Sequence, residues 1–275
     1  MNNKIYCSTG TMVGRVNDFD LDILFKAAPE IECDVFEFMF YPVMYERMRR
    51  DMPRIKREMH ESDIRYPVTH LDKDIGIYLS CSENGYKEKA LDMFRINCEV
   101  AADLGSFKTV LHLWGGLPSD KYMENNISLV EDLYDISEEY GLILCIENVP
   151  CALFDPLTHW KEIMKTSDRA TFIYDTRFSA FHELHDEFIN SGLFESSRIA
   201  HMHVSDFVGP PHDFASLRPI PHLGKGIADI DGLLTRIAPL YHNSITLESP
   251  EIHPDTTYPE RINEDIRYIR ERTQP

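Results

Sequence analysis

The stretch Leu142-Ile-Leu-Cys-Ile-Glu147-Asn148 is a short apolar run that ends in one carboxylate and one amide. A run of this length, preceded by a glycine (Gly141) that can close a helix, is typical of a buried strand in a parallel sheet. Side chains alternate along a strand, so Glu147 shares a face with Cys145 and Ile143. If that face lies inside a barrel, the residues between them face the surrounding helices.

Similar apolar runs recur along the chain, with amphipathic stretches between them. The predicted strands are Ile5–Thr9, Asp34–Phe40, Val68–Leu71, Thr109–Trp114, Leu142–Asn148, Thr171–Asp175, Ile199–Ser205 and Ser244–Glu248. The helical patterns between them include Met44–Glu61, Tyr86–Leu104, Met123–Tyr140 and Ile230–Leu240. Eight such units in 275 residues favour a closed barrel over a doubly wound open sheet. Since no low-complexity linker interrupts the series, we expect residues 1–275 to form a single (β/α)8 TIM-barrel domain.

The composition limits the partners and the compartment. The chain has 28 basic and 46 acidic residues, a formal net charge of −18. Such a surface repels phosphate backbones and anionic membranes, so we expect no nucleic-acid and no membrane partner. No apolar run approaches the roughly 18 residues of a membrane span, and the N-terminal residues lack a signal peptide's apolar core. Six cysteines without a CxxC pair indicate reduced thiols in a cytoplasmic protein.

Ionisable residues end four consecutive predicted strands. They are Glu147, Asp175, His203 and Glu248. Each alone could be a helix cap or a hydrogen-bonded core residue. Together at one barrel mouth, three carboxylates would repel one another and each would cost several kcal/mol to desolvate. A divalent cation relieves both costs, and this ligand set suits Mn²⁺, Mg²⁺, Co²⁺ or Zn²⁺.

Further polar and aromatic residues are predicted at the same mouth. His70 and His112 lie near the ends of the third and fourth strands. Trp114, beside His112 at the mouth, could stack on a bound ligand or simply pack the rim. Glu37, inside the second strand, could line the pocket or pair with another barrel residue. The segment Gly224-Lys225-Gly226 lies where many barrels bind phosphate, although a tight turn would equally explain it.

Five motifs follow one another in a fairly specific order. They are Cys145-Ile-Glu147-Asn148, Tyr174-Asp175-Thr176, His201-Met-His203-Val-Ser-Asp206, Leu223-Gly224-Lys225-Gly226-Ile227-Ala-Asp229 and Leu247-Glu248. With them the chain resembles the xylose-isomerase-like TIM-barrel superfamily of sugar (phosphate) isomerases and epimerases and of family 2 AP endonucleases. The resemblance extends through most of the chain.

The epimerase branch implies roles for the four strand-end residues. By this resemblance Glu147 and Glu248 bind one divalent metal ion and also move the substrate proton. Asp175 and His203 act as ligands only. Asp206 is expected to accept a hydrogen bond that fixes the ring of His203.

The AP endonuclease branch implies three zinc ions, of which this sequence matches only some ligands. His70 and His112, with Glu147 shared, match its first metal and could hold a second ion or contact substrate here. Its third metal needs a histidine where this chain has Phe178. It also needs an Asp-x-His segment where residues 218–220 read Arg-Pro-Ile. We therefore expect no third site.

The position of Phe178 also separates the chain from several ketose epimerases, which use a histidine there to hold substrate hydroxyls. Other side chains must then contact the substrate. The candidates are Trp114, Arg177, His182, Arg218 and His222; for His222 a supporting contact behind the site is the alternative.

Three functions remain open from the sequence. The first is a divalent-metal-dependent sugar or sugar-phosphate isomerase or epimerase that transfers a proton through an enediolate. The second is a hydrolase or lyase, such as a dehydratase, that uses one or two metal ions on the same barrel. The third is a non-catalytic sugar-binding protein. The identities of sugar and metal stay open, and such barrels often form homo-oligomers.

Overall fold

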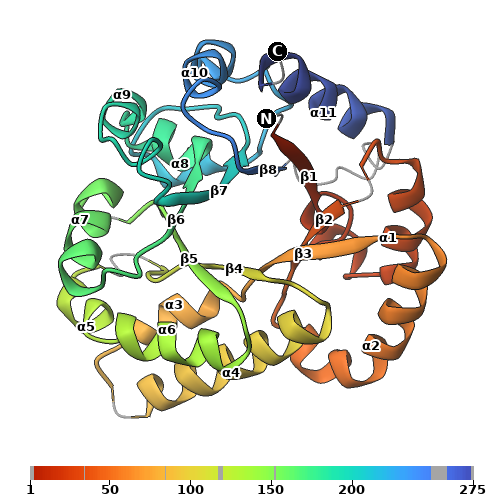
Figure 1. Ribbon diagram of the computed structural model, residues 1–275, viewed down its shortest axis with the longest axis horizontal. Coiled ribbons are helices and arrows are strands. Elements are labelled where there is room, and N and C mark those ends of the chain that lie inside the picture. The colour runs from red at the N-terminus through yellow and green to blue at the C-terminus, as the bar shows by residue number, and fades with distance from the viewer. Residues whose placement is uncertain are drawn as a thin grey trace.

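The computed structural model describes residues 3–33, 35–83, 85–116, 120–151, 153–248 and 259–273. Eight parallel strands form a closed barrel in sequence order, so the chain is a (β/α)8 barrel (Figure 1). The strands are β1 Lys4–Ser8, β2 Val35–Met39, β3 Arg65–His70, β4 Lys108–Leu111, β5 Ile143–Glu147, β6 Phe172–Asp175, β7 Ile199–Val204 and β8 Ser244–Leu247. Every predicted strand overlaps an observed one; Asp34, the first residue predicted for the second strand, lies outside the described residues.

Helices surround the strands on the outside of the barrel (Figure 1). The α-helices are α1 Leu21–Ala27, α2 Met44–Glu61, α3 Asp74–Leu79, α4 Tyr86–Asp103, α5 Met123–Ile127, α6 Val130–Glu139, α7 Pro156–Thr166, α8 Thr176–Phe181, α9 His185–Ile189, α10 Ile230–Ile237 and α11 Pro259–Thr273. Short 3-10 turns are η1 Thr9–Thr11, η2 Arg15–Asn17, η3 Ala28–Glu30 and η4 Phe214–Leu217.

The prediction of one continuous helix over Met123–Tyr140 is wrong in one respect, because this segment forms two helices, α5 and α6. Asn126 points inward, and its amide donates to the carbonyl of Leu113 and to the hydroxyl of Ser80. The Ser128 hydroxyl bonds back to the carbonyl of Asn125. Side chains that bond to nearby backbone groups in this way compete with the helical pattern, so the helix is interrupted here.

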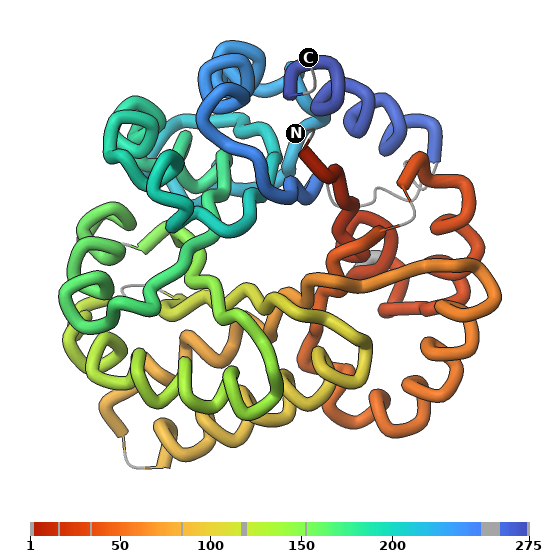
Figure 2. The backbone as a smooth tube through the Cα atoms, viewed as in Figure 1, coloured from red at the N-terminus to blue at the C-terminus, as the bar shows by residue number. Residues whose placement is uncertain are grey.

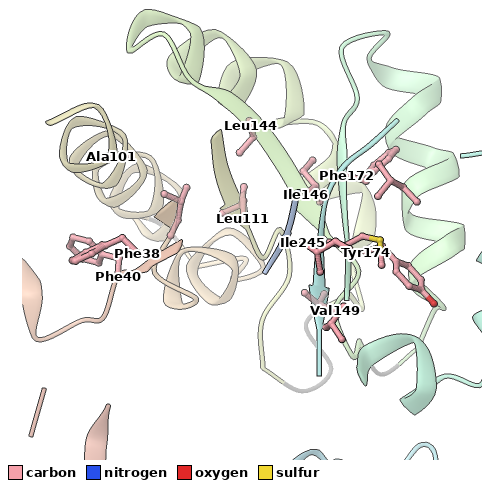
Figure 3. Close-up of a cluster of buried hydrophobic side chains, with 14 of the residues drawn as sticks. Phe38, Phe40, Ala101, Leu111, Leu144, Ile146, Val149, Phe172, Tyr174 and Ile245 are labelled. Carbon is pink, nitrogen blue, oxygen red and sulfur yellow. The ribbon is translucent and has the colours of Figure 1, made fainter. Parts of the chain in front are cut away.

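The alternation predicted for β5 is confirmed. Leu144 and Ile146 belong to the large apolar cluster that packs the strands against the helices (Figure 3). Cys145 belongs to a separate small cluster that takes one residue from each of five strands: Tyr6, Val68, Val110, Cys145 and Ile173. Glu147 therefore shares the inner face of β5 with Cys145, at the end where the βα loops begin.

The barrel closes between the first and last strands. β1 pairs with β8 over Lys4–Cys7 and Ser244–Leu247, and α11 packs beside β1, so the first and last described elements of the chain lie side by side (Figure 2). Because all strands are parallel, their carboxyl ends meet at one mouth. No helix in the described ranges is long and apolar enough to cross a membrane.

Candidate metal centre

The structure brings together the four residues predicted from the strand ends. Nδ1 of His203 lies 2.7 Å from Oε1 of Glu147 and 3.5 Å from Oε1 of Glu248. Asp175 offers a carboxylate oxygen within 4.8 Å of the ligand atoms of Glu147 and His203. All four side chains are buried. They come from the ends of β5, β6, β7 and β8.

Asp175 has a local role as well as a place at the centre. Its Oδ1 accepts from the backbone N–H of Phe178 at 2.9 Å and so caps α8. The amide of Asn148 pairs with the main chain of Asp175, accepting at 2.5 Å and donating at 3.0 Å. The Oδ2 of Asp175 is fully buried and has no hydrogen-bond partner among the described residues. An oxygen left over in this way fits a metal ligand.

Without a cation, burial and mutual repulsion oppose the ionisation of the carboxylates at the centre. Burial raises the pKa of Asp175 to about 7; Arg177 lowers it, whereas Glu147 and Glu248 raise it. Burial opposes the charged forms of Glu147 and His203 too. The attraction of His203 nevertheless holds the pKa of Glu147 well below its usual range. The charges of Glu37, Glu248 and Glu147 raise the pKa of His203 well above its usual value. A divalent ion in place of the proton on His203 would offset two of the three carboxylate charges.

A second group of ligand atoms adjoins the first. Nε2 of His70 lies 3.4 Å from Oε2 of Glu147, and His112 contacts the same oxygen through its Nε2. Nδ1 of His70 donates to the carbonyl of Leu71 at 2.8 Å, which turns Nε2 toward Glu147. Burial lowers the pKa of His112 to about 4, so its ring is neutral and able to bind a metal. Glu147 is thus shared by both groups.

Glu37 fixes the ring of His203 in the structure, a role the sequence assigned to Asp206. Oε2 of Glu37 accepts from Nε2 of His203 at 3.0 Å and lies 3.0 Å from Nε2 of His201. The Thr246 hydroxyl donates to the same oxygen at 2.9 Å. Of the two alternatives for Glu37, pairing inside the barrel is the one observed. Its signal in the sequence was a single carboxylate within an apolar strand.

The expectation for Asp206 was wrong because this carboxylate is used elsewhere. Its Oδ1 accepts from the backbone N–H of Phe207, and its Oδ2 accepts from Gly226 at 2.9 Å. It therefore holds the turn at Gly224–Gly226, where Gly224 has a positive φ of 73°.

Two cavities open at the mouth. One of about 480 Å³ includes Glu248, Arg177 and Arg218 in its wall. The other, of about 250 Å³, is lined by His112 and Trp114 and shares both arginines with the first. Pockets of this combined size accommodate small molecules.

The other predicted contact residues differ in position. Trp114 lines the smaller cavity and also stacks on His159, with ring centroids 4.1 Å apart. Neither His182 nor His222 lines either cavity. Nδ1 of His222 pairs with Oδ2 of Asp265 on α11 at 2.7 Å. The ring of His182 lies beside that of His212. These two histidines are therefore not part of the wall of either cavity and have other partners.

A third cluster was not foreseen from the sequence. Asp120, Cys151 and His159 are buried, with ligand atoms within 4.8 Å of one another. Asp120 accepts from the backbone N–H groups of Leu153 and Phe154 and lies 3.2 Å from Nε2 of His159. Asp120, which lies in the loop after β4, therefore connects the loop after β5 with α7.

Comparisons with known proteins agree with the barrel fold. A family model described as "Xylose isomerase-like TIM barrel" matches residues 25–272. No curated relative matches the chain.

Solved structures of low sequence identity share the fold. The D-allulose 3-epimerase from Methylomonas sp. is 14% identical, with a TM-score of 0.74 over 98% of this chain and 97% of that one. The 3-keto-D-glucoside 4-epimerase from E. coli is 14% identical, with a TM-score of 0.70 over 98% and 99%. An IolI protein with a zinc atom is 15% identical, with a TM-score of 0.72 over 98% and 96%.

Proposed function

The chain belongs to the xylose isomerase-like TIM barrel family, and on that premise we propose that it is a divalent-metal-dependent sugar or sugar-phosphate isomerase or epimerase. The observation that carries the proposal is the convergence of Glu147, Asp175, His203 and Glu248 at the barrel mouth, with a buried oxygen of Asp175 left without a hydrogen bond by the described residues. The likeness to two sugar epimerases supports it.

The four strand-end residues would hold the ion. Mn²⁺, Mg²⁺, Co²⁺ or Zn²⁺ bound there would supply Lewis-acid assistance to the carbonyl and hydroxyl oxygens of a ketose or aldose. Asp175 and His203 would serve as ligands only, and Glu37 orients the ring of His203 from behind. The zinc atom in the IolI protein supports a metal on this scaffold.

Glu147 and Glu248 move the proton. Both carboxylates approach Nδ1 of His203, so they flank one position at the mouth. One removes the proton from the carbon next to the carbonyl, which yields an enediolate. The other returns it, to the same carbon in an epimerisation or to the neighbouring carbon in an isomerisation.

Solvent-deuterium exchange tests this function. The protein supplied with Mn²⁺ and a panel of ketoses and ketose phosphates should exchange a carbon-bound proton with at least one of them. Glu147→Gln and Glu248→Gln should each reduce the exchange rate by about 100-fold or more, because general acid-base catalysis contributes on this scale. Glu124→Gln, an exposed change on α5, is the matched control. No exchange across the panel, or full exchange in both variants, would contradict the proposal.

The group of His70, His112 and Glu147 favours one alternative, a hydrolase or lyase with two metal ions. Metal analysis separates the two. One ion per chain with proton exchange supports the isomerase or epimerase. Two ions per chain, with loss of water from a polyol or cleavage of a substrate bond and no exchange, support the alternative.

A further inference from the structure

Four cationic side chains surround the space above the metal centre. Arg15, Lys73, Arg177 and Arg218 follow strands β1, β3, β6 and β7, and all four line the larger cavity. All but Arg15 also line the smaller one. In a chain with a net charge of −18, these four cations share the cavity wall with three acids, Asp72, Asp74 and Glu248, and can attract an anion into it.

Arg177 is the buried member of this group. It is 6% exposed, and its Nη1 donates to the carbonyl of Leu217 at 3.1 Å. Its Nη2 lies 3.8 Å from Oε2 of Glu248, a carboxylate that we assign to the metal ion. Its Nε has no hydrogen-bond partner within the described ranges. A buried N–H group without an acceptor is unfavourable. The Nε of Arg177 is therefore a donor that a further anion could satisfy.

The cations act on one another. Partial desolvation at the rim lowers the pKa of Arg218, and the charges of Arg177 and Arg15 lower it further. Lys73 follows β3, across the barrel from the loop after β7 that holds Arg218, and it lines both cavities. An anion placed between these groups would relieve their repulsion.

Two of the three acidic residues in the same wall are engaged elsewhere. Glu248 belongs to the metal centre. Asp72 is 2% exposed, its Oδ1 accepts from the backbone N–H of Asp74 at 3.1 Å, and burial raises its pKa. Only Asp74 remains among the acids in the wall of this cavity.

We propose that the substrate is an anionic sugar whose phosphate or carboxylate group is bound by Arg15, Arg177 and Arg218. This inference rests on the proposed function and narrows its substrate class. A guanidinium presents parallel N–H donors that match two oxygens of a phosphate or carboxylate. The sugar extends from the metal ion toward these arginines. The segment Gly224–Gly226, the phosphate site that the sequence suggested, is not part of the wall of either cavity.

Calorimetric titration of the full chain with Mn²⁺ tests the charge preference. The probes are D-fructose, D-fructose 6-phosphate and D-fructuronate, which share a carbon skeleton and differ at one end. We expect at least one anion to bind ten-fold or more tightly than D-fructose, and the tighter of the two identifies phosphate or carboxylate as the group. Equal or tighter binding of the neutral sugar would overturn the proposal.

Single-residue variants test whether the preference for an anion depends on these arginines. Arg15→Gln and Arg218→Gln change rim residues and should each weaken binding of the preferred anion about ten-fold and that of D-fructose by a clearly smaller factor. Arg49→Gln removes the same charge from the exposed face of α2 and should change neither. Equal weakening of all probes by Arg218→Gln, or the same loss in Arg49→Gln, would contradict the site. Charge-selective binding without any proton exchange would support the anion site and contradict the proposed isomerase or epimerase reaction.

Discussion

The carboxylate of Glu37 joins three partners from β7 and β8: His201, His203 and Thr246. It is completely buried, and the attraction of the two histidines keeps it ionised against the cost of burial. An acceptor that holds the second nitrogen of a metal-binding histidine fixes the ring and raises its basicity. The geometry of the centre therefore depends on a residue outside the ligand set.

Glu37→Gln should weaken Mn²⁺ binding by about 10- to 100-fold, because the neutral amide can still accept hydrogen bonds but no longer attracts the ring of His203 with a negative charge. Titration of the metal-free protein with Mn²⁺ measures this loss. Thr246→Val removes only one donor to Glu37 and should cost much less. Unchanged affinity in Glu37→Gln would mean that this carboxylate does not support the centre.

Sequence periodicity could predict that the four candidate ligands lie together, but not this support. Glu147, Asp175, His203 and Glu248 each end a strand, and parallel strands bring their ends together. Whether Asp206 or Glu37 reaches His203 depends on side-chain directions across the barrel, which one strand's pattern does not contain. The Asp120–His159 pair was missed for the same reason, since its members lie 39 positions apart.

At the scale of elements, the loop after β5 is tied to α7 through Asp120. We expect His159→Leu to lower the free energy of unfolding by about 1–3 kcal/mol, because it removes a partner from a fully buried carboxylate. Urea denaturation measures the change. Asp132→Asn, on the exposed side of α6, should have little effect, and a loss no greater in His159→Leu than in this control would contradict the role.

The helix α9 carries a pH-dependent contact with β6. Nδ1 of His185 lies 2.8 Å from the hydroxyl of Tyr174, and burial lowers the pKa of His185 to about 4. The unfolded chain, with a histidine pKa near 6.5, binds more protons in this range, so this contribution to stability is present above about pH 6.5 and is lost toward pH 4.

Replacing His185 with Gln should therefore reduce the loss of stability between pH 7.5 and pH 5 by roughly 1 kcal/mol. Urea denaturation at the two pH values gives the difference. His60→Gln, at the exposed end of α2, serves as the control. An identical pH dependence in wild type and His185→Gln would show that this histidine does not carry the effect.

At the scale of the whole molecule, we propose that residues 1–275 form one cooperative domain. β1 pairs with both β2 and β8, so no strand can leave without opening the barrel. Circular dichroism and tryptophan fluorescence should report the same urea midpoint, since Trp114 and Trp160 are both buried. Two separate transitions would indicate independent units.

The closed barrel could be predicted because eight apolar runs alternate with helical patterns. The cation-lined mouth could not, because Arg15, Lys73, Arg177 and Arg218 follow four different strands and only closure of the barrel assembles them. The net charge of −18 even indicates the opposite sign.

Crystallography of the protein soaked with Mn²⁺, with anomalous scattering to locate the ion, tests the central claim most directly. The account predicts one strong peak at the mouth, about 2.0–2.2 Å from oxygens of Glu147, Asp175 and Glu248 and from Nδ1 of His203. Asp175→Asn should weaken or abolish that peak. A peak confined to His70 and His112, or no peak at saturating Mn²⁺, would contradict the account.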